Sequence, residues 1–269
     1  MIRWSAHLGT LWPERAPEER PADARAAGFT LLEAWWPPAA DVGAWVDAVR
    51  GAGMRATLVN ADGGDLAAGE RGYCTDPLRR ADVLEAVRAA AGTVRACGGT
   101  DVNLLVGRDD GVRDGRAQWD TAVATVRAAG DVAAGLGARV LVEHLNDRDV
   151  VRPLLPTPAC AAAFVREVGH PAVRLLFDAY HAAAMGLDPA AEARRVGPLV
   201  GHVQYADHPG RGAPGTGTVD LALFAASLAG WGYRGAVGLE FVPSGPTAAA
   251  LAGIPEVGGV APLGSAPSP

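Results

Sequence analysis

The chain has 269 residues, a mass of 27.5 kDa and a hydrophobic content of 49%. This is enough to bury one large core, and a single parallel barrel takes ~250 residues. The formal net charge of −6 and the scattered basic residues argue against a nucleic-acid-binding surface, because phosphate neutralisation needs clustered Lys and Arg. The three cysteines lack paired spacing and predict neither a disulfide framework nor a zinc site. We see no secretory signal and no apolar run of ~20 residues, so we expect a soluble, cytosolic protein without a membrane segment.

Short apolar runs recur along the chain and alternate with segments rich in Ala, Arg and Glu. The eight runs cover residues 2–8, 30–35, 54–60, 101–106, 139–143, 173–178, 200–204 and 236–241. Continuous apolarity is typical of parallel strands that helices cover on both sides. The order therefore predicts an α/β fold, a (β/α)8 TIM barrel, as a single domain over residues 1–256. Residues 257–269 lack an apolar pattern and are expected to form a flexible C-terminal tail.

Local signals mark several helix ends and three long loops. Helix starts are predicted at Thr157-Pro158, Asp76-Pro77 and Asp188-Pro189, and helix ends at Gly28, Gly53, Gly98 and Gly137. Segments 61–75, 146–156 and 206–218 follow predicted strands and are dense in Gly, Pro, Asp or Arg. On a barrel these are loops of the catalytic rim.

Four of the later runs end in a polar group. These groups are Glu143, Asp178, Gln204 and Glu240, separated by 35, 26 and 36 residues. Such spacing matches strand–helix units and would bring the four groups to one rim. Three carboxylates and an amide offer only oxygen ligands, the set suited to a hard divalent ion, with Mg²⁺ or Mn²⁺ expected. His202 has the same strand parity as Gln204, but Gln204 is the predicted ligand because it lies nearer the carboxyl end of its strand.

Glu143 and Glu240 could face opposite sides of a small bound substrate. One would then remove a proton from carbon while the other returns one, and the metal would hold the oxygens of the developing enediolate. A structural salt bridge would explain one such glutamate, but four polar groups in successive runs favour a shared site. A substrate-binding role is predicted for His181, which follows Asp178 into the next loop, and for the loop arginines Arg71 and Arg211. Trp12, Trp35 and Trp36 could wall the pocket, pack in the core or contact another subunit, and we assign none of these roles.

The chain resembles the hydroxypyruvate isomerase family of the xylose-isomerase-like TIM barrels, from residue 2 to about residue 245. The stretches that carry the resemblance are Gly64-Asp-Leu-Ala-Ala-Gly-Glu-Arg-Gly72, Val142-Glu-His-Leu-Asn-Asp-Arg-Asp149, Phe177-Asp-Ala-Tyr-His181, Gly201-His-Val-Gln204 and Gly238-Leu-Glu240. The resemblance implies interconversion of hydroxypyruvate and 2-hydroxy-3-oxopropanoate (tartronate semialdehyde). It also implies that Glu143 and Glu240 are the proton-transfer pair, and that both bind the metal together with Asp178 and Gln204.

Three departures from the family pattern concern the loops and the first strand. His7 stands where an Asn is usual, the loop that begins at Asn60 lacks its usual Pro, and the loop Gly215-Thr-Gly-Thr-Val-Asp220 lacks the acidic residue that the family pattern has near Gly217. Because these segments shape the pocket, the resemblance implies the isomerase scaffold more firmly than the substrate.

The alternative functions differ in whether they would use the residues of the proposed site. A 2-oxo-tetronate isomerase or a ketose 3-epimerase would use the same residues on a longer oxo-acid or sugar. An endonuclease of the same barrel superfamily would need a basic groove and more metal-binding histidines than the six in this chain. A non-catalytic sugar-binding protein would have no use for both glutamates. Barrel enzymes of this type often form homo-oligomers, although no interface can be read from the sequence.

Overall fold

The computed structural model describes residues 3–37, 40–252 and 254, and its eight strands close into a parallel barrel. The strands are β1 (Arg3–His7), β2 (Leu31–Ala34), β3 (Arg55–Asn60), β4 (Asp101–Leu104), β5 (Arg139–Glu143), β6 (Val173–Asp178), β7 (Val200–Tyr205) and β8 (Ala236–Leu239). Each strand pairs in parallel with its neighbours in sequence, and β8 closes the ring against β1. The predicted TIM barrel is confirmed. The predicted tail at 257–269 lies outside the described residues.

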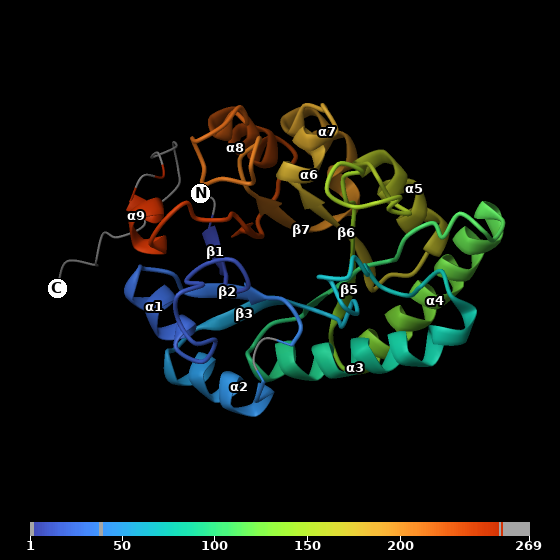
Figure 1. Cartoon of the computed structure of the whole chain (residues 1–269), viewed down its shortest axis with the longest axis horizontal. Coiled ribbons are helices and arrows are strands. Elements are labelled where there is room, and N and C mark those ends of the chain that lie inside the picture. Colours follow the sequence, from blue (N-terminus) through green and yellow to red (C-terminus); the bar gives the residue numbers. More distant parts are fainter. Residues whose placement is uncertain (1–2, 38–39, 253, 255–269) are drawn as a thin grey trace.

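Helices cover the outside of the strand ring (Figure 1). They are α1 (Arg20–Ala26), α2 (Val42–Gly51), α3 (Arg80–Ala96), α4 (Gly115–Gly135), α5 (Pro158–Val168), α6 (Ala179–Ala184), α7 (Pro189–Val196), α8 (Leu221–Gly230) and α9 (Thr247–Ala252), with 3-10 turns η1 (Pro77–Arg79) and η2 (Gly197–Leu199). Their inner faces supply buried Ala, Val and Phe side chains, which pack against the outward-facing residues of the strands in one continuous core.

The predicted helix boundaries rest on recognisable caps. The side chains of Thr157 and Asp188 accept hydrogen bonds from backbone N–H groups in the first turns of α5 and α7, which confirms those two starts. Asp76 instead caps the 3-10 turn η1, and α3 begins only at Arg80, so that predicted start is early. All four glycines predicted to end helices have positive φ: Gly28, Gly53, Gly98 and Gly137.

Two strands, β4 and β8, end two residues before the predicted apolar runs do. β4 ends at Leu104, because the backbone of Val106 accepts a hydrogen bond from Cys74 in the β3–α3 loop and so has left the barrel. β8 ends at Leu239, so Glu240 and Phe241 lie just beyond it. The Glu240 backbone still donates to the carbonyl of Tyr205 in β7, which holds Glu240 at the barrel mouth.

The barrel interior is layered. Leu58, Leu141 and Leu176 form a separate buried cluster inside the ring. Each lies two residues before a polar residue on its own strand: Asn60, Glu143 and Asp178. Since side chains alternate with a period of two, the leucines fill the layer directly beneath a polar layer at the carboxyl ends of the strands.

Other sequence expectations concern cysteines and membrane segments. Cys74, Cys97 and Cys160 are free cysteines, the first two buried and Cys160 partly exposed. Across residues 3–37, 40–252 and 254, the helices lack the combination of length and apolarity that a membrane span requires.

Candidate active site

The four polar groups predicted from the strand ends all lie at the carboxyl rim of the barrel. Glu143 and Asp178 are the last residues of β5 and β6, Gln204 is the penultimate residue of β7, and Glu240 follows β8. Their exposed fractions are only 6%, 1%, 1% and 4%, respectively. Such buried carboxylates need charged or polar partners to offset desolvation.

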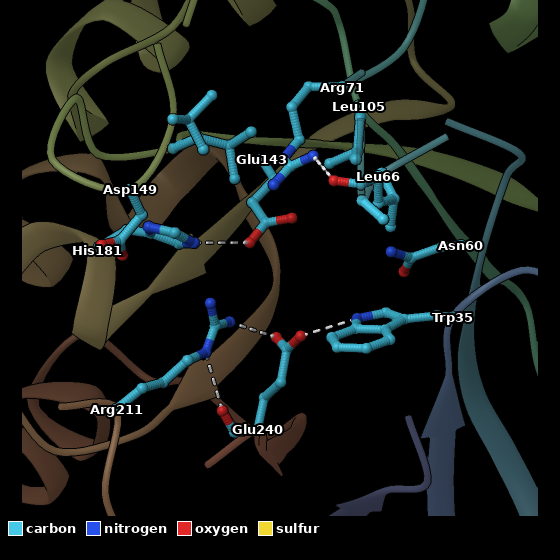
Figure 2. Close-up of a pocket in the computed structure, with 13 residues that line it drawn as sticks. Trp35, Asn60, Leu66, Arg71, Leu105, Glu143, Asp149, His181, Arg211 and Glu240 are labelled. Carbon is cyan, nitrogen blue, oxygen red and sulfur yellow. Dashed lines mark hydrogen bonds and ion pairs between the residues drawn. The ribbon is translucent and has the colours of Figure 1, made fainter. Parts of the chain in front are cut away.

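A cavity of about 490 Å³ opens above this rim. Glu143, Glu240 and His181 line it together with Arg71 and Arg211, as Figure 2 shows. Most of its remaining wall is apolar: Trp35, Leu66, Ala67, Leu105, Leu145 and Val150. The pocket thus brings together five of the seven residues predicted for the site. Asp178 and Gln204 do not line it and are almost fully buried at the same rim.

The Glu240 carboxylate is held by two donors, and the ring of His7 lies nearby. The indole Nε1 of Trp35 donates to its Oε1 at 2.9 Å, and Nη2 of Arg211 lies 3.0 Å from its Oε2. His7 Nε2 lies 3.6 Å from Oε1, beyond hydrogen-bonding distance, and His7 Nδ1 accepts a hydrogen bond from the backbone N–H of Gly9. Burial acts to raise the pKa of Glu240, but Arg211, His7 and Trp35 outweigh it and hold the pKa below its usual value. Glu240 is therefore ionised.

The surroundings of Glu143 shift its pKa in the opposite direction from that of Glu240. Its Oε2 accepts one hydrogen bond from Asn103 Nδ2 at 2.8 Å, and no Arg or Lys pairs with it among the described ion pairs. Burial, with the nearby charges of Glu240 and Asp178, raises its pKa well above the usual value. Glu143 is therefore inclined to carry a proton while Glu240 does not.

His181 presents a defined nitrogen to the pocket. The backbone N–H of Asn146 donates to its Nδ1 at 3.2 Å, so Nδ1 is unprotonated and Nε2 carries the hydrogen. Nε2 lies 3.7 Å from both Glu143 Oε1 and Asp178 Oδ2. Burial, assisted by the charge of Arg211, lowers the pKa of His181 to about 3. The ring is a neutral hydrogen-bond donor, which suits the substrate-binding role predicted for it.

A cation would find oxygen ligands in the rim. Ligand atoms of Glu143, Asp178 and His181 lie within 4.8 Å of one another. The tautomer of His181 turns an N–H toward this group, so its ring is a poor ligand there. Gln204 offers a better ligand, because its Oε1 is buried without a hydrogen-bond partner among the described residues, while its Nε2 donates to Glu33. Carboxylate oxygens and an unpaired amide oxygen fit a hard divalent ion.

The two arginines predicted to bind substrate differ in how far other protein groups already occupy their guanidinium nitrogens. Arg211 is committed to protein groups, since its Nη2 contacts Asp178 and Glu240 and its Nε donates to the Glu240 carbonyl. In the part of the chain that the structure describes, Arg71 makes hydrogen bonds only through Nη1, which donates to the carbonyls of Leu66 and Glu70. The rest of the Arg71 guanidinium is free for a ligand in the cavity.

Comparison with known proteins decides the family. Residues 21–256 match the xylose isomerase-like TIM barrel family. The chain belongs to this family. A Streptomyces coelicolor relative, provisionally named a hydroxypyruvate isomerase, is 36% identical over 94% of this chain and 95% of its own. The Escherichia coli hydroxypyruvate isomerase is 30% identical over 93% of this chain and 97% of its own. These relatives confirm the resemblance to hydroxypyruvate isomerases and the expectation of an isomerase.

Two further relatives carry other names. A 2-oxo-tetronate isomerase from Cupriavidus necator is 31% identical over 93% of this chain and 96% of its own. A crystal structure from Brucella melitensis described as an AP endonuclease of family 2 is 31% identical, with a TM-score of 0.88 over 94% of this chain and 97% of that one. The fold of this xylose isomerase-like barrel is thus shared by proteins with different names.

Several residues that support the site escaped the sequence predictions. Asn103 contacts Glu143, Trp35 contacts Glu240, and Glu33 contacts Gln204. Glu33 and Asn103 are polar residues inside apolar runs, the same signal that identified the four rim groups of this xylose isomerase-like barrel. Trp35 gave no such signal, because an aromatic residue at a strand end is equally typical of a core.

Proposed function

We propose that this protein is a hydroxypyruvate isomerase, which interconverts hydroxypyruvate and 2-hydroxy-3-oxopropanoate. The observation that carries the proposal is the pair Glu143 and Glu240, which line one cavity and whose environments shift their pKa values in opposite directions. Two titratable groups separated in this way are suited to act as acid and base at the same pH. The hydroxypyruvate isomerase relatives, which align over most of the chain, support the same reaction.

The reaction moves a carbonyl group between neighbouring carbons. Glu240, ionised beside Arg211 and Trp35, accepts the proton that leaves C3 of hydroxypyruvate, and the electron pair of that bond forms the C2–C3 double bond of an enediol. As that double bond forms, the electron pair of the C2 carbonyl moves onto O2. Glu143 then delivers a proton to C2, and the hydroxyl proton of O3 passes to O2, so that an aldehyde forms at C3 and a hydroxyl at C2. His181 donates its Nε2–H to a substrate oxygen and so stabilises the negative charge that develops there.

The donor set of the rim fits a divalent ion, for which Mg²⁺ or Mn²⁺ is the expected choice. Glu143, Asp178, Gln204 and Glu240 would hold it, each glutamate keeping a second oxygen for proton transfer. When bound, the ion would supply positive charge that stabilises the oxygens of the enediolate. We place the protein in the cytosol, as the sequence predicts.

Arg71 is assigned to the substrate carboxylate. We expect Arg71→Ala to raise the KM for hydroxypyruvate roughly 10- to 100-fold, because a charge-assisted pair contributes about 1.5–3 kcal/mol, with a smaller change in kcat. Arg88→Ala is the matched control, since Arg88 lies on α3 and its ion pair with Glu85 is exposed. Steady-state kinetics of both variants test the assignment, and an unchanged KM for Arg71→Ala would remove Arg71 from the binding site.

A 2-oxo-tetronate isomerase is the second candidate, because the Cupriavidus necator relative is similar over most of the chain. A ketose 3-epimerase, which would reprotonate the same carbon on its other face, would require a site that also accepts a sugar without a carboxylate. An endonuclease is disfavoured, because a net charge of −6 opposes binding of a phosphate backbone. In addition, a single group of three His, Cys, Asp or Glu ligands was found among the described residues.

The substrate is tested by comparing kcat/KM for hydroxypyruvate, a 2-oxo-tetronate and a free ketose at equal Mn²⁺ concentration. We expect the highest value for hydroxypyruvate. A higher value for the four-carbon acid would transfer the assignment to 2-oxo-tetronate isomerisation, and a higher value for the ketose would transfer it to epimerisation.

A further inference from the structure

Glu33 is a fully buried acid that the proposed reaction does not use. It lies on β2, which β1 and β8 separate from β7 in the strand ring, and its exposed fraction is 0%. Its Oε2 accepts a hydrogen bond from Gln204 Nε2 at 3.0 Å. His202 Nε2, also on β7, lies 3.2 Å from Oε2 and 3.4 Å from Oε1. Glu33 therefore reaches across the interior to two side chains of one strand.

The barrel interior leaves room for the Glu33 carboxylate. A Cβ atom at Gly238 on β8 would lie 1.8 Å from Glu33 Oε1, so only glycine leaves room for the Glu33 side chain on its way to β7. The β2–β3 pairing also shifts register between Leu32 and Glu33, and such irregularities re-aim a side chain.

The contact fixes which way the Gln204 amide points. A carboxylate accepts hydrogen bonds and donates none, so it pairs with the NH₂ end of an amide and not with the oxygen end. Oε1 of Gln204 is accordingly turned away from Glu33, where it is buried without a partner among the described residues. A buried carbonyl oxygen without a partner is unfavourable unless something binds it.

We propose that Glu33 is a positioning residue that orients the Gln204 amide so that its oxygen faces the divalent ion. This inference rests on the proposed metal site and adds a residue that does not touch the ion. Partners that orient metal ligands in this way typically change metal affinity or activity by about 10- to 100-fold when removed.

The variant Glu33→Gln tests the orientation with almost no change in shape. His202 Nε2 and Gln204 Nε2 both contact Oε2 of Glu33, so the two donors would share the single oxygen of the introduced amide. A neutral amide oxygen holds the Gln204 NH₂ group less firmly than a carboxylate does, and the NH₂ group of the introduced amide offers the Gln204 oxygen a competing partner. We expect the dissociation constant for Mn²⁺ to rise about 10-fold.

The measurement is a titration of the metal-stripped protein with Mn²⁺ alone, followed by electron paramagnetic resonance of the free ion. His202→Gln is the matched control, because it changes the other partner of Glu33 and leaves the Gln204 contact in place, so its Mn²⁺ affinity should stay within about twofold of wild type. Gln204→Leu provides a second background. There Glu33→Gln should have no further effect on Mn²⁺ binding if Glu33 acts through Gln204. Circular dichroism and thermal unfolding establish that each variant is folded.

The outcomes separate this inference from the metal site itself. A 10-fold loss in Glu33→Gln that disappears in the Gln204→Leu background supports the positioning role. Unchanged Mn²⁺ affinity, or an equal loss in both backgrounds or in His202→Gln, overturns it and makes Glu33 part of a structural pair. If the wild-type protein binds no Mn²⁺, the proposed metal site itself is wrong, and this inference fails with it. Should Glu33→Gln fail to fold, Gly238→Ala displaces the same carboxylate, and wild-type Mn²⁺ affinity in that variant contradicts the proposal.

Discussion

Glu240→Gln is expected to lower kcat for hydroxypyruvate isomerisation by about 10³-fold and to leave the fold intact. The substitution removes the base but keeps an oxygen for the ion and an acceptor for the indole N–H of Trp35. Arg211 loses one of its two carboxylate partners and keeps Asp178. KM should change much less than kcat, because the group acts on the proton and not on the bound substrate.

Kinetics of Glu240→Gln are best compared with those of Glu85→Gln. Glu85 lies on α3 in an exposed ion pair with Arg88, so the same chemical change there should leave both constants as in wild type. Turnover of Glu240→Gln within about tenfold of wild type would exclude Glu240 as the base.

Glu143→Gln is expected to abolish turnover to a similar extent and also to stabilise the metal-free protein. Burial and the charges of Glu240 and Asp178 raise the pKa of Glu143 in the folded state. A carboxyl with a raised folded pKa contributes most stability below its unfolded pKa, and that contribution is lost as the pH rises through the folded value. Glutamine carries no proton to lose and still accepts from Asn103.

The gain in stability should therefore depend on pH and on metal. We expect metal-free Glu143→Gln to unfold at a higher temperature than metal-free wild type at pH 8, by roughly 2–4 °C for each kcal/mol of relieved repulsion, and by less at pH 5. Mn²⁺ should stabilise the wild type more than the variant, because the ion offsets the same repulsion. Differential scanning calorimetry at the two pH values decides this. An equal or lower unfolding temperature of Glu143→Gln at pH 8 would show that the rim charges are not in conflict without metal.

The sequence predicted the parts of the site that follow from the strand–helix repeat. Glu143, Asp178 and Gln204 were identified because parallel strands end at one rim, and the structure brings their side chains there. The same reasoning placed Glu240 correctly, although β8 ends one residue before it. Strand edges were less accurate, because apolar residues such as Val106 are buried by a loop as well as by a strand.

Loop geometry could not be predicted in this way. The 206–218 loop was noted for lacking an acidic residue near Gly217, but the structure shows that Asp207, fully buried, organises it. Its carboxylate accepts hydrogen bonds from the backbones of Gly215, Gly217 and Val219. This folded loop carries Arg211 back over the barrel mouth to Glu240, a contact between residues 29 positions apart.

Contacts across the barrel interior also could not be predicted from the sequence. The hydrogen bond from Gln204 to Glu33 joins residues 171 positions apart, and nothing in either local pattern indicates it. Such a contact depends on barrel closure and on the space left by Gly238, so it follows only from the three-dimensional structure.

The central claim is that this barrel moves a proton between adjacent carbons of hydroxypyruvate. The direct measurement is incubation of the purified protein with hydroxypyruvate in D₂O, with Mg²⁺ or Mn²⁺ and then with EDTA, followed by NMR. We predict that 2-hydroxy-3-oxopropanoate forms with carbon-bound deuterium and that EDTA stops its formation. Aldehyde formation without deuterium at carbon, in single turnovers and after equilibration, would contradict proton transfer through the two glutamates. Neither aldehyde nor exchange would contradict hydroxypyruvate as the substrate.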